Sequence, residues 1–172
     1  KPATRTTDEQ GIDHFHGHAK LGAEMANGIL RRLKFDNDTR KRVVRLVEFH
    51  DDRQFPLNHR GVRRAIHRIG ADLFPDYLKL ARADALAQNP ALPEKLARLS
   101  EIERLYTEIL EAQNCLSLKD LAVTGRDLID AGVKPGPTLG VILNAMLEAV
   151  IEHPEYNTKE YLLERILPLV SS

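Results

Sequence analysis

The chain has 172 residues, 42% of them hydrophobic and 29% charged, and its 25 Lys and Arg residues balance 25 Asp and Glu residues. This composition is typical of a globular protein with one domain or two small ones, and no run approaches the 18 apolar residues of a membrane span, so we expect no membrane partner. A polar start and a single cysteine, Cys115, indicate neither a signal peptide nor an oxidising compartment, and we expect a cytoplasmic protein.

The balanced total hides a basic segment over residues 31–70. It contains twelve Lys and Arg residues and five Asp and Glu residues, a local charge of +7. Such a segment can be the phosphate-binding face of a nucleic-acid-binding protein, or simply the solvated surface of packed helices. Its candidate RNA-binding residues are Arg60, Arg63 and Arg64.

Apolar periodicity predicts a series of helices in the first two thirds of the chain. Residues 1–13 are polar and aperiodic, so we expect a loop there. The first helix carries an apolar stripe formed by Leu21, Met25, Ile29 and Leu33. A turn follows it, with Asp38 as the predicted N-cap of the second helix. The expected helices cover residues 17–33, 39–50, 60–69, 72–88 and 93–114.

After Cys115 the pattern changes to short helical pieces rich in glycine. Thr124 is a plausible N-cap for one of them, and Gly136-Pro137 predicts the start of a helix over residues 137–152. Asn157 is expected to cap a last helix that runs to residue 170.

No alternating strand of useful length is present. We therefore expect an all-α fold. The predicted division is a helical bundle over residues 1–114 and a smaller helical tail module over residues 115–172.

Two histidines and one aspartate are candidate metal ligands. His18 begins the first predicted helix and His50 ends the second, so antiparallel packing of these helices would bring the two imidazoles together. Asp84, inside a later helix, could join them. These groups bind divalent cations, and a metal-bound water is a nucleophile near neutral pH. Each residue could equally serve only as a cap or a hydrogen-bonding group at a helix end.

Residues 125–140, GRDLIDAGVKPGPTLG, form a second candidate site. Gly132 is expected to end a short helix in the left-handed conformation. The backbone N–H groups of Thr138 and Leu139, with Lys134 beside them, would make a phosphate site. A tight structural turn between two packed helices explains the same residues.

Several segments resemble the HD domain and C-terminal part of one class of bacterial tRNA nucleotidyltransferases, the CCA-adding enzymes and their poly(A) polymerase-like relatives. The segments are HFHGHAKLGAEMANGILRRLKFDND, VVRLVEFHD, LKLARADALAQN, the GRDLIDAGVKPGPTLG stretch and HPEYNTKEYLLE. The resemblance covers nearly the whole chain, but only the rear half of the family's architecture.

The resemblance implies an HD-like bundle in which His18, His50 and Asp84 match the later ligands of a divalent metal such as Mg²⁺ or Mn²⁺. In the family a His-Asp dyad is followed by a variable residue and Gly-Lys-Pro. Because this chain begins Lys1-Pro2, we expect the dyad to lie just before it.

The resemblance also implies tRNA as partner, and nucleotide addition from CTP and ATP with Mg²⁺ by a separate head that these residues do not contain. We therefore predict the tRNA-binding body and tail of such an enzyme, inactive by itself. The RNA-binding residues would be Arg60, Arg63, Arg64, Lys134 and Thr138.

Two alternatives stay open from the sequence. One is a metal-dependent HD-type phosphohydrolase that acts on a cyclic or nucleotide phosphate, which the three candidate metal ligands would serve. The other is a helical scaffold with neither activity.

Overall fold

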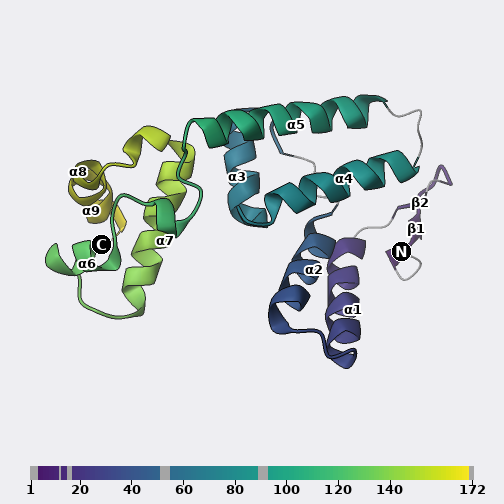
Figure 1. Ribbon diagram of the computed structural model, residues 1–172, viewed down its shortest axis with the longest axis horizontal. Helices are drawn as coiled ribbons and strands as arrows, with labels where there is room; N and C mark the ends of the chain where they lie inside the picture. Colours follow the sequence, from purple (N-terminus) through teal and green to yellow (C-terminus); the bar gives the residue numbers. More distant parts are fainter. Residues whose placement is uncertain (1–3, 12, 15–16, 51–54, 89–92, 171–172) are drawn as a thin grey trace. The chain divides into compact units, whose positions relative to one another are not determined.

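The computed structural model describes residues 4–11, 13–14, 17–50, 55–88 and 93–170. Helices dominate these ranges and confirm the all-α prediction (Figure 1). A two-residue antiparallel ladder joins β1 (Thr6–Thr7) to β2 (Asp13–His14), so the loop expected at the start of the chain is partly ordered by strand pairing. None of the helices in the described ranges combines the length and hydropathy that crossing a membrane requires.

Residue contacts divide the chain into two compact units. The first unit contains Lys1–Gln54 and Asp72–Leu99, and the second contains Phe55–Ala71 and Ser100–Ser172. The predicted boundary between residues 114 and 115 rests only on the change of sequence pattern after Cys115, and it stays a prediction.

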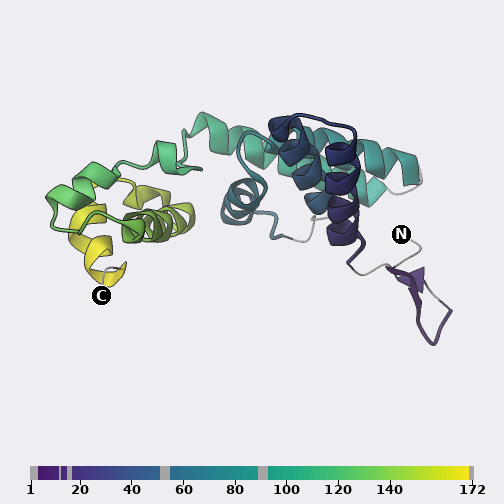
Figure 2. The ribbon, with the colours of Figure 1, turned by 90° about the horizontal axis from the view of Figure 1, so that it is seen from below.

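In the first unit, α1 (His18–Arg32) and α2 (Asn37–Phe49) pack side by side (Figures 1 and 2). Gly22 permits this approach, because a Cβ at that position would lie 3.3 Å from Cγ1 of Val47. The N-cap of α2 is Asp36, not the predicted Asp38. Its carboxylate accepts hydrogen bonds from the backbone N–H groups of Asp38 and Thr39, and these bonds lower the pKa of Asp36.

The apolar stripe of α1 is more exposed than its periodicity predicts. Met25 is 59% exposed, Ile29 43% and Leu33 60%, whereas Ala23 is the buried residue of this helix. The buried position of α1 is therefore a small residue, whereas three of the four residues of the predicted stripe are exposed. The first unit also contains α4 (Phe74–Gln88), where Phe74 and Tyr77 are fully buried.

The second unit is built around α7 (Pro137–Glu152), whose observed bounds match the prediction. Its hydrophobic core combines apolar residues of α7 with residues on both sides of it in the sequence. The core includes Leu128, Ile142, Met146, Leu147, Val150, Ile151 and Leu162.

Besides α7, the second unit contains the longer helices α3 (His59–Ile69) and α5 (Pro93–Glu111), of which α5 begins in the first unit. Its short helices are α6 (Gly125–Asp130), α8 (Lys159–Tyr161) and α9 (Leu167–Val170). The last predicted helix is in fact interrupted by a π-helical turn at Leu162–Ile166. Its N-cap is Thr158, since Asn157 is used elsewhere and bonds to the backbone of Ala122 and Asp120.

Candidate nucleic-acid interface

His18 and His50 lie together, as the sequence predicts. Pairing of α1 with α2 brings their Nε2 atoms to 3.2 Å, with the rings edge to face. The Nδ1 atom of His50 lies 2.7 Å from the carbonyl oxygen of Val47. Because a carbonyl can only accept, Nδ1 of His50 donates that bond, and the lone pair of the neutral ring is left on Nε2, facing His18.

Two imidazoles in this arrangement fit adjacent positions around one divalent cation. With metal–nitrogen bonds of about 2.0–2.1 Å, the 3.2 Å separation corresponds to an angle at the ion of roughly 100°. Asp84 lies in α4. Within the described ranges, no three His, Cys, Asp or Glu side chains gather as a metal-binding group, so the structure unites two of the three predicted ligands. Lys1 and Pro2, next to the expected dyad, lie outside these ranges. Metal binding stays a prediction.

Arg63, predicted as an RNA contact, is instead a buried structural residue. It is 7% exposed, and its guanidinium donates to the carbonyl oxygen of Ile151 at 2.8 Å. Longer bonds reach the carbonyl of Glu152 at 3.3 Å and Oδ1 of Asn114 at 3.4 Å. Arg63 therefore satisfies acceptors at the end of α7, and burial lowers the pKa of its guanidinium.

Arg60 and Arg64 are exposed, but one carboxylate already holds both. Glu152 forms ion pairs with each of them, and its side chain is only 16% exposed. These two arginines hold the pKa of Glu152 below its usual range, against the effect of desolvation. Any phosphate at this face would have to compete with that carboxylate.

Exposed cations without a carboxylate partner gather on α1, α2 and the turn between them. Within the described ranges, the cations of this kind in this region are Lys20, Arg31, Arg32, Lys34 and Lys41. We call the last four, which lie in or near the turn, the hairpin cations. Arg42, by contrast, pairs with Asp76 at 2.8 Å and Asp72 at 3.4 Å. The sequence shows that this region is basic, but not which of its charges are neutralised.

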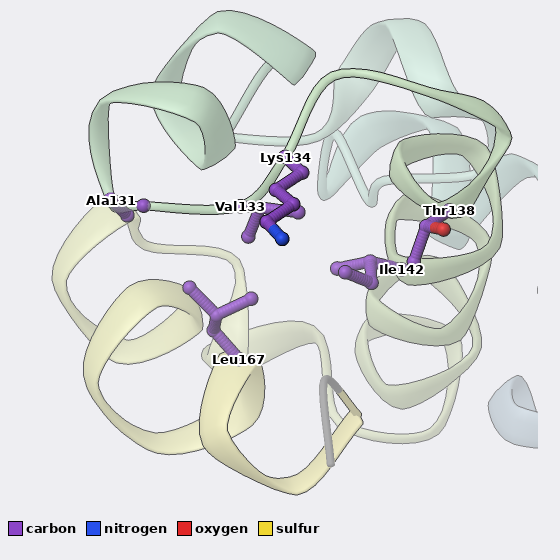
Figure 3. A pocket seen from close by; sticks show the side chains of 7 residues that line it. Ala131, Val133, Lys134, Thr138, Ile142 and Leu167 are labelled. Atoms are coloured by element: carbon purple, nitrogen blue, oxygen red, sulfur yellow. The ribbon is translucent and has the colours of Figure 1, made fainter.

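Lys134 and Thr138 line a cavity of about 440 Å³ in the second unit (Figure 3). Its walls are otherwise apolar, from Val133, Ile142 and Leu167, and the Lys134 amine is turned into the space between them. The residues that form the cavity come from both sides of the Gly-Pro turn and from α9.

At the Gly-Pro turn, the conformation of Gly132 agrees with the prediction, whereas the backbone N–H of Leu139 does not. Gly132 adopts a φ of 96°, the left-handed conformation expected of it. The N–H of Leu139, however, donates to the carbonyl of Gly136 at 3.1 Å. It is therefore occupied and does not face the solvent as a phosphate ligand.

Three aromatic rings that the sequence analysis did not single out form a stack in the second unit. The rings of His153 and Tyr156 have centroids 4.6 Å apart, and those of Tyr156 and Tyr161 are 4.3 Å apart. The available signal was the spacing of His153, Tyr156 and Tyr161 within HPEYNTKEY, a segment that the sequence analysis used only for the family resemblance.

The chain matches a family model described as tRNA nucleotidyltransferase domain 2 over residues 4–166. It is 32% identical over 151 residues to an A-adding tRNA nucleotidyltransferase of Deinococcus radiodurans, covering 87% of this chain and 34% of that protein. It is 35% identical over 153 residues to a CC-adding tRNA nucleotidyltransferase of Thermus thermophilus, covering 88% of this chain and 33% of that protein.

A CCA-adding enzyme of Lacticaseibacillus paracasei is 37% identical over 81 residues, which are 42% of this chain and 19% of that enzyme. No solved structure gives a significant match. The chain spans about a third of the length of the first two relatives. These findings do not support the alternative of an HD-type phosphohydrolase. With most of its length matched to one family model, the chain belongs to the tRNA nucleotidyltransferase family and corresponds to a C-terminal part of such proteins.

Proposed function

We propose that this chain is the part of a tRNA nucleotidyltransferase that holds tRNA while the whole enzyme adds nucleotides of the 3′-terminal CCA sequence. Relatives that match most of this chain bear names for adding A or CC to tRNA. A tRNA substrate would place this function in the cytoplasm, with CTP, ATP and Mg²⁺ used by a nucleotidyltransferase head outside these residues.

The observation that carries the proposal is the set of hairpin cations. Each presents a full positive charge to the solvent, with no carboxylate that a phosphate would have to displace. Such charges release the counterions of the tRNA backbone, which is the main source of affinity for a nucleic acid read by shape rather than by sequence. Arg63, which is buried, is no longer part of the proposed contact, and Arg60 and Arg64 contribute less because of Glu152.

The test is the salt dependence of tRNA binding, measured by fluorescence anisotropy with labelled tRNA. In the variant R31Q/R32Q/K34Q/K41Q, the slope of log K against log salt should become shallower by about 3, since each lost phosphate contact removes roughly 0.7–0.9. The matched control removes four exposed cations that are held by carboxylates, K79Q/R104Q/R126Q/K159Q. Both variants lose the same net charge, so a specific interface predicts that only the first changes the slope strongly. Equal slopes for the two variants would refute the assignment of this face.

We also propose that His18 and His50 bind one divalent cation through their Nε2 atoms. The 3.2 Å separation of these atoms and the bond from His50 to Val47 support it. An imidazole pair favours Zn²⁺, Ni²⁺ or Co²⁺ over Mg²⁺, because nitrogen is a softer ligand than oxygen. Such an ion would hold the amino-terminal end of α1 to the carboxyl-terminal end of α2.

A further inference from the structure

The stack formed by His153, Tyr156 and Tyr161 follows from the backbone at the end of α7. His153 ends that helix, and Pro154–Tyr156 form a turn of 3₁₀-helix in which the N–H of Tyr156 donates to the carbonyl of His153 at 2.9 Å. A 3₁₀-helix has three residues per turn, so side chains three positions apart eclipse each other. The His153 and Tyr156 rings consequently lie face to face, with an interplanar angle of 22°.

The third ring is fixed by the start of the next helix. Thr158 caps α8 by accepting a bond from the N–H of Tyr161, and its own N–H donates to the carbonyl of Tyr156 at 2.7 Å. These two bonds place the Tyr161 ring over the Tyr156 ring, at an interplanar angle of 21°. A side-chain hydrogen bond between the two tyrosines raises the pKa of the Tyr156 phenol. Asn157, between them, is tied to the backbone of Ala122 and Asp120. The stack is thus held in place before any ligand arrives.

One end of the stack is open. The His153 side chain is 52% exposed, as expected for a ring covered on one face. Its Nδ1 atom lies 3.2 Å from Oε1 of Glu155, a contact that orients the ring through its edge nitrogen. Within the described ranges, Tyr156 is the aromatic partner of His153. An aromatic ring that is stacked on one side and solvated on the other is a surface on which a nucleobase can lie.

The charge beside this surface suits a nucleic acid. Glu152, the residue before His153, is held by the exposed side chains of Arg60 and Arg64, and Arg63 donates to its backbone carbonyl. The carboxylates of Glu152 and Glu155 also interact electrostatically with Arg63, so the three arginines and two glutamates leave one positive charge in excess when His153 is neutral. A phosphate next to a stacked base would meet arginines that are already positioned, at the cost of sharing them with Glu152.

We propose that the exposed face of His153 is a stacking platform for one unpaired nucleobase of RNA, which continues the stack of His153, Tyr156 and Tyr161, with an adjacent phosphate near Arg60 and Arg64. The proposal rests on the proposed function for its ligand class. It adds a contact to a base, whereas the hairpin cations contact phosphates only.

The experiment compares a short single-stranded RNA with an oligonucleotide of equal length and charge that lacks bases. Wild-type protein should bind the base-containing RNA at least about 5-fold more tightly than the abasic one, the lower end of the range for a base on an aromatic ring. H153A should abolish this preference, and H153F should retain it. The matched control is H59A, because His59 is also 52% exposed and also pairs with a glutamate, Glu108, but stacks on no described ring.

A direct readout needs no variant. When the base-containing RNA binds, the imidazole proton resonances of His153 should move upfield through the ring current of the base, while those of His59 stay in place. The proposal is overturned by equal affinity for the two oligonucleotides, or by an H153A protein that keeps the wild-type preference. Either result would leave the salt-slope test of the hairpin cations unaffected, so the two proposals fail separately.

Discussion

Replacing Arg63 by methionine tests whether this arginine stabilises the fold or binds RNA. Methionine keeps an apolar stem of similar length but removes every donor, so the carbonyls of Ile151 and Glu152 and the amide of Asn114 lose a partner. The short bond to Ile151 involves a charged donor and is worth about 2 kcal/mol, and the two longer ones about 0.5 kcal/mol each. We expect R63M to lower the free energy of unfolding by about 3 kcal/mol.

Urea denaturation followed by circular dichroism measures this loss. With a slope of about 2 kcal/mol per molar urea, the midpoint should fall by roughly 1.5 M. The control is R64M, which breaks an exposed pair with Glu152 and should cost less than about 1 kcal/mol. A midpoint within about 0.3 M of wild type for R63M, together with weaker tRNA binding, would refute the structural assignment and restore Arg63 as an RNA contact.

Three further predictions follow from single contacts. G61A should destabilise the protein by at least about 2 kcal/mol in thermal or urea unfolding, because the added Cβ would overlap the carbonyl oxygen of Pro56; G125A, with open space at its Cβ, should stay within about 0.5 kcal/mol. Asp127 has a depressed pKa through hydrogen bonds from Lys159 and Thr124. Its ionised form therefore stabilises the fold above the unfolded value of 3.8, and this contribution is lost as pH falls through the lower folded value. D127N should thus be less stable than wild type at neutral pH, with a gap that narrows below about pH 3.8 in acid titrations; a constant gap contradicts this. Finally, Co²⁺ added to the wild-type chain should give a visible ligand-field absorption band that H18Q and H50Q both lose; a band that survives in either variant excludes the shared site.

The sequence was most informative where a residue has a strong local preference. Pro137 and the His153-Pro154 pair mark the two ends of α7 through φ restriction and the missing N–H, and the structure places the helix between them. Gly132 was predicted in the left-handed conformation for a similar reason. Two acidic residues in one turn were harder, because Asp36 and Asp38 are both good N-caps. Only the backbone geometry selects Asp36.

Periodicity predicted the helices better than their buried faces. Met25 and Ile29 belong to an apolar stripe, yet both are exposed, while Gly22 lets α2 approach α1 closely through Val47. The candidate site also has parts that the sequence predicts and parts that it does not. The His18–His50 contact joins two helices that are adjacent in the sequence, so it could be predicted.

The state of each arginine depends on residues far away in the sequence. Arg63 meets Ile151 across 88 positions, and Glu152 holds Arg64 at a similar separation. Nothing local in residues 60–64 distinguishes the buried guanidinium from its exposed neighbours. The aromatic stack was missed for another reason, since three rings spaced over nine positions align only if the intervening turn is of the 3₁₀ type.

The distance along the chain between Arg63 and its acceptors has a consequence for biosynthesis. A ribosome that adds roughly 5 to 20 residues per second needs about 4 to 18 s to proceed from Arg63 to Ile151. For all of that time α3 lacks partners for its apolar residues Val62, Ala65 and Ile66, which are fully buried in the folded unit. The second unit is discontinuous in the sequence, so its first segment must wait for its last. Its folding is therefore expected to finish only after its last segment has been synthesised, with the α3 segment the part most in need of protection from aggregation until then.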